Sequence, residues 1–505
     1  MNTQLRRNDQ SKIMNTKTIQ LSLLLCAILG TIYLSFIFPG WIYYLIIPSA
    51  ILVSIHVIYQ IFLKLKKLNQ PAKIVHHKMD ACEQPMVSIH IPISNEPPEL
   101  VIRSLKACLS QNYHNFEVII LDNNTQDINL WKPVEDFCRN HEILKYHRYP
   151  KLEGFKAGAL DKCIHLSARS SKYIMVIDAD YCLKTYALKE AVKEAEINKL
   201  DLLQFPQAYR NINFRNESLA MEYQHYFDIY AAAANTDKAM LSTGTLCLFR
   251  FDSLKELPGW KNCQTITEDA EIGLQFIKAG KYTAFSPKIL GYGLMPQNAI
   301  DVGKQRARWI FGNMHTLLNN KWNLGSKRDL NIIMQLTAWL NFLVPVYLAL
   351  LTLLLVGSQI YDKNELNLIL ILGTIPFLIN ILGKSILYDK HSLSRLQILR
   401  TLAIHIHFNF RSSIVWLPCL LGGRKPFYKT PKDNKQRRNF QFSDLICLLF
   451  FGIGIMAFMN DLMLPAAIYT LLGNVYLFST LYTLTALKYS ETSSRINLKL
   501  QTSSL

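Results

Sequence analysis

The sequence predicts an α/β domain with a doubly wound, mostly parallel sheet, inserted between membrane-spanning α-helices. Half of the 505 residues are hydrophobic, and the formal net charge is +18. Apolar stretches of membrane-spanning length gather near both ends of the chain. Between them, residues 84–310 alternate short apolar runs with amphipathic, charged stretches, which is enough chain for one globular domain.

Membrane topology explains the excess of Lys and Arg better than nucleic-acid binding does. The basic residues concentrate beside the apolar segments, and the sequence has no DNA- or RNA-binding signature. The ten cysteines form no C-x-x-C pair and no disulfide-type spacing, which favours a reducing compartment. We therefore expect a lipid bilayer, and no nucleic acid, among the partners.

Residues 1–65 are predicted to form an N-terminal transmembrane hairpin. Its two apolar stretches, 18–39 and 41–63, are joined by the uncharged turn FPGW and followed by the basic run KLKKLNQPAK. Because positive charge marks the cytosolic side, both the N-terminus and the middle domain, residues 66–325, are expected in the cytosol.

Residues 326–505 are predicted to form C-terminal transmembrane or interfacial helices. Five apolar segments lie there, near 331–357, 366–387, 398–422, 443–460 and 463–487. A complete crossing at 398–422 would leave the basic stretch GGRKPFYKTPKDNKQRRNF outside, against the positive-inside rule. The same segment carries side chains that are costly in lipid: His405, His407, Asn409 and Arg411. We therefore expect 398–422 not to cross, which leaves six crossings in a multi-pass protein of a bacterial-type inner or plasma membrane.

Three apolar strands of the middle domain end in polar residues. PMVSIHIPISNEPPE contains a strand over 86–93, FEVIILDNN ends after Asp122, and KYIMVIDADY ends with Asp178 and Asp180. Helical periodicity, as in LVIRSLKACLSQ, separates the strands. Strands that finish in acids and alternate with helices predict a site along the carboxyl edge of the sheet.

The acids at these strand ends suit a nucleotide site. Carboxylates at i and i+2, such as Asp178 and Asp180, repel each other unless a cation or a basic partner neutralises them. A divalent cation, Mg²⁺ or Mn²⁺, would bridge such a pair to a diphosphate, although a D-x-D also arises by chance. Asp122 is placed either to accept hydrogen bonds from a base or ribose or simply to cap its loop.

A basic segment lies between these acids along the chain. In KLEGFKAGAL, small residues before a helix allow backbone amides to approach a phosphate, and Lys156 supplies a positive charge. The alternative is a solvated lysine before an ordinary helix.

Two further motifs have both a structural and a chemical interpretation. TITEDAEIG places Glu268 and Asp269 at the start of a helix. In the structural interpretation these acids cap the helix. In the chemical interpretation Asp269 is a general base that takes a proton from an acceptor hydroxyl. In QRARW, Gln305 and Arg308 are one helical turn apart and can face one diphosphate, while Trp309 offers a surface for a sugar ring. The alternative is an interfacial anchor of Trp and Arg.

The chain contains, in this order, SNEP, Asp122, KAGAL, DAD, TGT before LFR, PGW, TITED and QRARW. This ordered set resembles the processive family-2 membrane glycosyltransferases, which are cellulose-synthase-like and hyaluronan-synthase-like. The resemblance covers residues 86–315 in motif detail and the flanking helices in layout. It implies a cytosolic GT-A domain, Rossmann-like with a mostly parallel sheet, between transmembrane helices. It also implies an inverting hexosyltransferase with a divalent cation and a nucleotide-sugar donor, expected to be a UDP-sugar.

The resemblance implies roles for individual residues. It assigns nucleotide-sugar binding to Asp122, Lys156, Asp178, Gln305 and Arg308, the metal to Asp180, the catalytic base to Asp269, and acceptor binding to Trp309 and Glu268. FYKTPK, at 427–432, is similar to the cytosolic gating loop F-x-V-T-x-K of cellulose synthases, with Phe427, Thr430 and Lys432 matching and Lys429 replacing the valine. Tyr181 follows DAD where bacterial cellulose synthases tend to have His, which argues against cellulose as the product.

The implied function is transfer of sugar from the donor to a growing β-linked polysaccharide at the cytosolic membrane face, with export through the chain's own helices. One alternative is transfer of a single sugar to a lipid acceptor. A transporter or inactive scaffold is another, although every expected acid is present. The polar side chains of 398–422 either face the exported sugar chain or bond helix to helix.

Overall fold

The computed structural model describes residues 43–69, 84–263, 265–296, 298–341, 344–359, 361–388, 394–420, 422 and 441–487. The predicted stretch at 18–39 and the gating-like loop, with Phe427, Thr430 and Lys432, lie outside these residues. The chain divides into two compact units. The α/β unit is built on Phe62–Trp339, and the helical unit is built on the chain up to Ile61, Leu340–Lys425 and Phe440–Thr483.

The α/β unit is centred on a seven-stranded sheet with the order β3-β2-β1-β4-β8-β6-β9. Four neighbouring strands run parallel: β1 (Val87–Ile93), β2 (Phe116–Asn123), β3 (Leu144–Tyr149) and β4 (Tyr173–Val176). One strand, β8 (Cys247–Arg250), is antiparallel to both of its neighbours, β4 and β6 (Leu202–Gln204), and β9 (Thr283–Phe285) runs parallel to β6. A second sheet has the order β5 (Cys182–Leu183), β10 (Gly291–Gly293), β7 (Ala208–Tyr209). The predicted α/β fold with a mostly parallel sheet is therefore confirmed.

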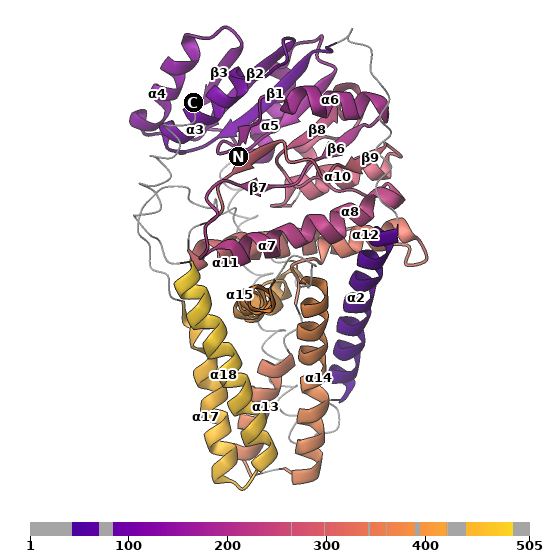
Figure 1. Cartoon of the computed structure of the whole chain (residues 1–505), viewed down its shortest axis with the longest axis vertical. Coiled ribbons are helices and arrows are strands. Elements are labelled where there is room, and N and C mark those ends of the chain that lie inside the picture. The colour runs from indigo at the N-terminus through magenta and orange to yellow at the C-terminus, as the bar shows by residue number, and fades with distance from the viewer. Residues whose placement is uncertain are drawn as a thin grey trace, which may run out of the picture. The chain divides into compact units, whose positions relative to one another are not determined.

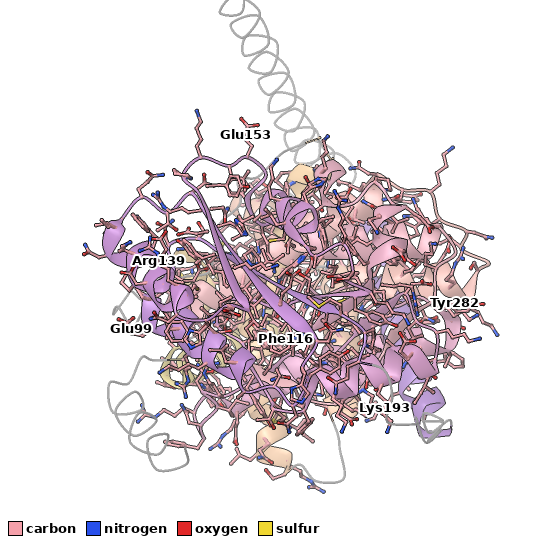
Figure 2. All side chains as sticks on the ribbon, turned by 90° about the horizontal axis from the view of Figure 1, so that it is seen from above. Glu99, Phe116, Arg139, Glu153, Lys193 and Tyr282 are labelled. Atoms are coloured by element: carbon pink, nitrogen blue, oxygen red, sulfur yellow. The ribbon has the colours of Figure 1, made fainter. Side chains whose placement is uncertain are left out.

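Helices cover both faces of the large sheet because alternate residues of each strand point to opposite sides. Val118 and Ile120 of β2 pack in one core with helices α3 (Pro98–Leu109), α4 (Ile128–Arg139) and α6 (Ala187–Ile197). Ile119 and Leu121 pack on the other face against α5 (Phe155–Leu166). Figure 1 shows these helices around the strands, and Figure 2 shows charged Glu99, Arg139 and Lys193 towards the edge, with Phe116 at the centre.

Further helices complete the α/β unit. They are α7 (Glu217–His225), the π-helical turn η2 (Tyr226–Ala231), α8 (Ala232–Ala234), α9 (Phe251–Lys255), α10 (Glu268–Lys278), α11 (Ala299–Leu318) and α12 (Lys327–Leu336), with short 3-10 turns at Asn235–Asp237 and Trp260–Asn262. In Figure 1, α7, α11 and α12 lie together on the side of the unit away from β1–β3.

The predicted apolar segment at 331–357 is not one helix. Its first part belongs to α12, which ends at Leu336 within the α/β unit, and its second part forms α13 (Val344–Gly357) in the helical unit. The first part differs from a membrane segment because two of its polar side chains bond within the α/β unit. Asn331 donates to Asp237, and the Gln335 amide donates to the carbonyl of Ala239 at 2.7 Å. These bonds hold α12 on the α/β unit.

The helical unit contains α2 (Tyr43–Asn69, its last turns beyond the unit), α13, α14 (Lys363–Tyr388), α15 (Arg395–Ile414), α16 (Leu417–Leu420), a 3-10 turn at Phe442–Leu445, α17 (Ile446–Met459) and α18 (Met463–Ala486). Two of the described helices, α14 and α18, are long and apolar enough to cross a membrane. Shorter apolar helices cover Ala50–Leu65, Leu348–Gly357 and Ser443–Met459. Six crossings stay a prediction.

The polar side chains of α15 make side-chain bonds within the helical unit. The imidazole of His405 bonds to Asn380 at 3.1 Å, that of His407 bonds to Thr480 at 3.2 Å, and Arg411 donates to Gln441 at 2.6 Å. Asn409 accepts from Asn341 at 2.5 Å. The bonds of His405 and His407 join α15 to α14 and α18, which is the helix-to-helix role of the two expected, whereas Asn409 and Arg411 bond to residues outside the helices.

Candidate active site

A cavity of about 400 Å³ opens at the carboxyl edge of the parallel strands. We call it the main cavity. The ends of β1, β2 and β4, the starts of α5 and α10, and α11 supply its walls. It brings together seven of the predicted site residues, which are Lys156, Asp178, Glu268, Asp269, Gln305, Arg308 and Trp309.

Asp122 and Asp180 lie at the same edge but are buried and do not line the cavity. Asp122 is 0% exposed and accepts a hydrogen bond from the Tyr146 hydroxyl at 2.8 Å. Burial raises the pKa of Asp122, although hydrogen bonds from Thr125 and Tyr146 oppose this effect. Asp180 is 1% exposed, and its Oδ2 accepts from the N–H of Leu294 at 2.7 Å. The direct ligand roles of both residues stay predictions.

Lys156 is the central cation of the main cavity. It follows Gly154, whose φ of 84° turns the chain into α5. Its Nζ donates to Asp178 Oδ1 at 2.5 Å and to the carbonyl of Gly244 at 2.8 Å, and lies 4.0 Å from Glu268 Oε1. Burial alone would lower the pKa of Lys156, but Asp178 and Glu268 raise it above its ordinary value. The side chain is therefore held as a fixed positive charge.

Glu268 and Asp269 begin α10 and share one electrostatic environment. Burial and the neighbouring Asp269 raise the pKa of Glu268 to about 7. Burial also raises the pKa of Asp269, and Lys156 opposes this effect. Both carboxyls therefore hold a proton more readily than exposed acids do, which is the property expected of a general base that works near neutral pH.

Glycine at position 244 makes room for the Asp269 carboxylate. Gly244 has a φ of +84°, and a Cβ added there would lie 2.8 Å from Asp269 Oδ2. We expect Gly244→Ala to reduce kcat at least tenfold, because the backbone is strained in this region and the carboxylate must move. Steady-state kinetics of the purified variant test this, with Gly280→Ala as the control, since its φ is also positive but nothing lies within 4 Å of its added Cβ. Equal kinetics for the two variants would contradict the expectation.

The raised pKa values predict the pH dependence of turnover. An acid with a raised pKa loses its basic form at a higher pH, so kcat should begin to fall at a pH above the one at which an exposed aspartate takes up its proton. In Glu268→Gln any part of the acid limb that reflects protonation of Glu268 should disappear, while the part that reflects Asp269 should remain, because the two neighbouring acids titrate as a pair. Measuring kcat from acid to alkaline pH tests both points. Complete loss of activity in Glu268→Gln would instead identify Glu268 as the base.

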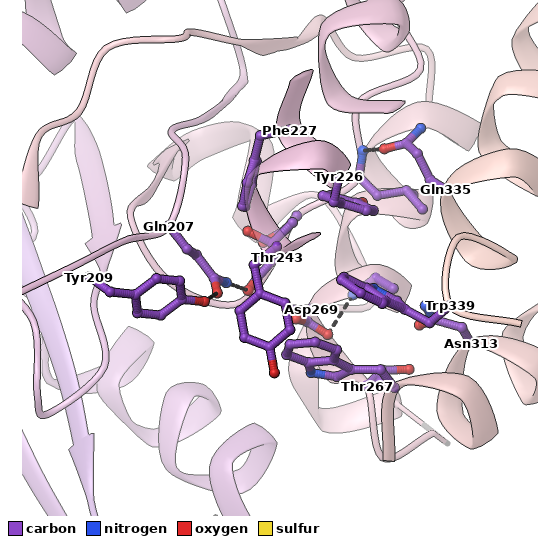
Figure 3. Close-up of a pocket in the computed structure, with 15 residues that line it drawn as sticks. Gln207, Tyr209, Tyr226, Phe227, Thr243, Thr267, Asp269, Asn313, Gln335 and Trp339 are labelled. Carbon is purple, nitrogen blue, oxygen red and sulfur yellow. Dashed lines mark hydrogen bonds between the residues drawn. The ribbon is translucent and has the colours of Figure 1, made fainter. Parts of the chain in front are cut away.

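A second, smaller cavity of about 70 Å³ adjoins the main cavity. Both cavities are lined by Gln207, Thr243, Thr267, Asp269 and Trp309. We call the second cavity the aromatic chamber, because aromatic rings make up much of its wall. These rings belong to Tyr209, Tyr223, Tyr226, Phe227, Trp309 and Trp339. Figure 3 shows Asp269 between Tyr209 on one side and Trp339 on the other. Asp269 thus lines both cavities.

The rings of the chamber pack on one another. The Trp309 ring lies 5.6 Å from Tyr223, edge-on, and 5.4 Å from Trp339. Tyr226, the first residue of the π-helical turn, stacks on Trp339 with an interplanar angle of 12°. Such turns are frequent at functional sites. Flat, partly apolar walls of this kind suit the faces of a sugar ring.

QRARW lies on α11, and its residues fall into two environments. Gln305, Arg308 and Trp309 face the main cavity, and Gln305 Oε1 accepts a hydrogen bond from the Tyr223 hydroxyl at 2.8 Å. Arg306 is buried and pairs with Glu222 of α7. Gly244 lies in the motif TGT, but the sequence alone assigns this glycine no role, and it does not identify Glu222, Tyr223 or Trp339. None of them stands in a charged or regularly spaced pattern that would have identified it.

The described residues contain no group of three or more His, Cys, Asp or Glu side chains that converge on a metal position. Mg²⁺ at nucleotide sites needs only one or two carboxylates, because phosphate oxygens complete its coordination. Asp178 fits this role, since its carboxylate lines the cavity and its side chain is 34% exposed. The carboxylate of Asp180 is turned to Leu294.

Comparison with known proteins agrees with the chemistry of the site. Residues 173–382 match a family model described as "Glycosyl transferase family group 2". The chain is 25% identical over 317 residues to the poly-beta-1,6-N-acetyl-D-glucosamine synthase of Staphylococcus epidermidis, covering 61% of this chain and 74% of the relative. It is 23% identical to the cellulose synthase 1 catalytic subunit of Komagataeibacter xylinus, covering 57% and 39%.

Other relatives extend this set. The chain is 24% identical to a probable glucomannan 4-beta-mannosyltransferase of Oryza sativa, covering 46% of this chain and 44% of the relative. Among solved structures, a mannosyltransferase from Pyrobaculum calidifontis in complex with GDP-Man and Mn²⁺ matches with a TM-score of 0.48 and 15% identity, covering 68% of this chain and 99% of that one.

Proposed function

We propose that this chain, which carries a glycosyltransferase domain of family 2 and is homologous to processive enzymes of that family, extends a β-linked polysaccharide from a nucleotide-sugar donor. The donor is expected to be a UDP-sugar, and the reaction is expected to invert the anomeric configuration. One observation carries the proposal. A charged cavity and an aromatic chamber meet at Asp269, so a donor and an acceptor can approach one carboxylate from two sides.

In the proposed reaction, Asp269 accepts the proton of an acceptor hydroxyl. The hydroxyl oxygen forms a bond to the anomeric carbon as the bond from that carbon to the diphosphate oxygen breaks. The bonding electrons leave with the nucleoside diphosphate, and no covalent sugar intermediate forms. Lys156 and Arg308 lie in the main cavity, where their charge stabilises the departing diphosphate.

The remaining site residues position the two substrates. Gln305 and Asp178 line the donor side, and the indole of Trp309 faces the acceptor. A divalent cation, when bound, would neutralise charge on the diphosphate. Asp178 would bind this cation directly. The buried Asp180 would lie behind Asp178, and Asp122 would lie near the nucleoside.

The wider setting is part of the proposal. We propose that the α/β unit faces the cytosol, that the helical unit lies in the bilayer, and that the product leaves through it. The presence of α14 and α18, both of membrane-spanning length and hydropathy, supports this setting. The gating role of Phe427, Thr430 and Lys432 rests on their motif alone.

Product analysis tests the proposed function. The full chain in membrane vesicles is supplied in turn with radiolabelled UDP-glucose, UDP-N-acetylglucosamine and GDP-mannose, and the product is sized and digested with linkage-specific glycosidases. We expect one donor to give a β-linked polymer. A single sugar on a lipid would favour the lipid-acceptor alternative, and no transfer from any donor would overturn the proposal.

A further inference from the structure

Arg306 lies in the middle of QRARW, yet the proposed reaction does not use it. Its guanidinium forms a two-point ion pair with Glu222, with Nη2 to Oε2 at 2.5 Å and Nη1 to Oε1 at 3.2 Å. The side chains are 4% and 3% exposed. Burying two charges carries a large desolvation cost, so a buried pair is a weak source of stability. The residues around the ion pair indicate a different reason for its presence.

Those neighbours are the rings of the aromatic chamber. The Arg306 guanidinium lies 5.6 Å from the centre of the Tyr223 ring and 5.2 Å from that of the Trp339 ring. Trp309 contacts the same two rings, at 5.6 Å and 5.4 Å. Tyr223 and Trp339 therefore each contact the buried cation and the indole that lines both cavities.

The ion pair also links separate segments of the chain. Glu222 and Tyr223 belong to α7, Arg306 and Trp309 belong to α11, and Trp339 follows α12. The Tyr223 hydroxyl donates to Gln305, so the same ring is tied to the donor side of the site. A planar guanidinium held at two points by a carboxylate has one orientation, and it fixes the rings that pack on it.

We infer that the Arg306–Glu222 pair is a positioning device that sets the ring geometry of the aromatic chamber and thereby the affinity for the acceptor saccharide. This inference rests on the proposed function. Neither residue lines the main cavity or the aromatic chamber, so the pair acts through Tyr223, Trp339 and Trp309.

The test separates acceptor binding from donor binding. Arg306→Lys keeps the charge but loses the planar fork, and Glu222→Gln keeps the shape but loses the charge. For each variant we would measure the KM for an oligosaccharide prepared by digesting wild-type product, together with the Kd for UDP. We expect the acceptor KM to rise roughly tenfold, because the two-point hold on the guanidinium is lost and the rings packed on it are no longer fixed, with the Kd for UDP changed less than about twofold.

Two further variants guard against a merely structural explanation. Arg306→Met with Glu222→Leu replaces the pair by apolar groups, a change that buried ion pairs often tolerate without loss of folding. We expect this protein to fold yet keep the raised acceptor KM. Arg250→Lys with Asp201→Asn is the matched control, because this partly buried pair (3.6 Å, side chains 24% and 14% exposed) touches neither cavity.

The outcomes are distinct. An unchanged acceptor KM in Arg306→Lys and Glu222→Gln, or restoration of it in the apolar double variant, would overturn the positioning role. Equal increases in acceptor KM and in the Kd for UDP would do the same. A wild-type chain that transfers no sugar from any donor would instead overturn the proposed function, and this inference with it.

Discussion

Asp269→Asn is expected to lower kcat by about a thousandfold, within the range for loss of a general base, while the Kd for UDP changes less than about threefold. Asparagine has nearly the same shape and cannot take up the acceptor proton at neutral pH. Asp269 lines both cavities, and α10 fixes it at the junction between them. Donor binding depends mainly on other groups, so turnover and affinity should separate.

Steady-state turnover and titration with UDP measure the two quantities. Asp252→Asn on α9 is the matched control, since this side chain is 79% exposed and pairs with Lys255 three residues further along. Both of its parameters should equal those of the wild type. Wild-type turnover in Asp269→Asn would exclude Asp269 as the base.

Lys156→Gln is expected to weaken UDP binding by about 10- to 100-fold, which corresponds to the loss of a hydrogen bond to a charged group. Its Nζ holds Asp178 and lies near Glu268. Removing the cation leaves these carboxylates facing an anionic diphosphate without compensation. It should also move the acid limb of the pH profile upward, because Lys156 is one of the groups that lower the pKa of Asp269.

Calorimetric or fluorescence titration with UDP gives the affinity. Lys162→Gln is the matched control, because Lys162 lies on the same helix and its side chain is exposed. It should bind UDP as the wild type does. If Lys156→Gln also keeps wild-type affinity, the diphosphate does not bind beside this lysine.

Much of the fold and of the main cavity could be predicted from the sequence. Buried strands such as VSIHIPI and FEVIILDN have strong local signals, and parallel strands place their carboxyl ends at one edge. Asp178 therefore had to lie near the ends of β1 and β2. Glu268 and Asp269 were recognisable because acids at a helix start point away from the helix body towards whatever faces its N-terminus.

Other features depend on tertiary packing and could not be predicted. Trp339 follows α12, which is amphipathic. The predicted apolar segment at 331–357 joined α12 and the next helix, α13, in one segment. The pairing of Glu222 with Arg306 joins residues 84 positions apart. The burial of Asp122 beneath Tyr146 likewise depends on a hydroxyl from the neighbouring strand.

The π-helical turn η2 (Tyr226–Ala231) limits which mutations this segment can accept in evolution. A turn closed from i to i+5 holds an extra residue, so deleting a single residue there would restore the regular spiral and rotate the adjoining side chains by about 100°. Tyr226 and Phe227 could then no longer both keep their present partners, Trp339 and Phe285. Substitutions in this segment should therefore be tolerated far more readily than any alteration of its length.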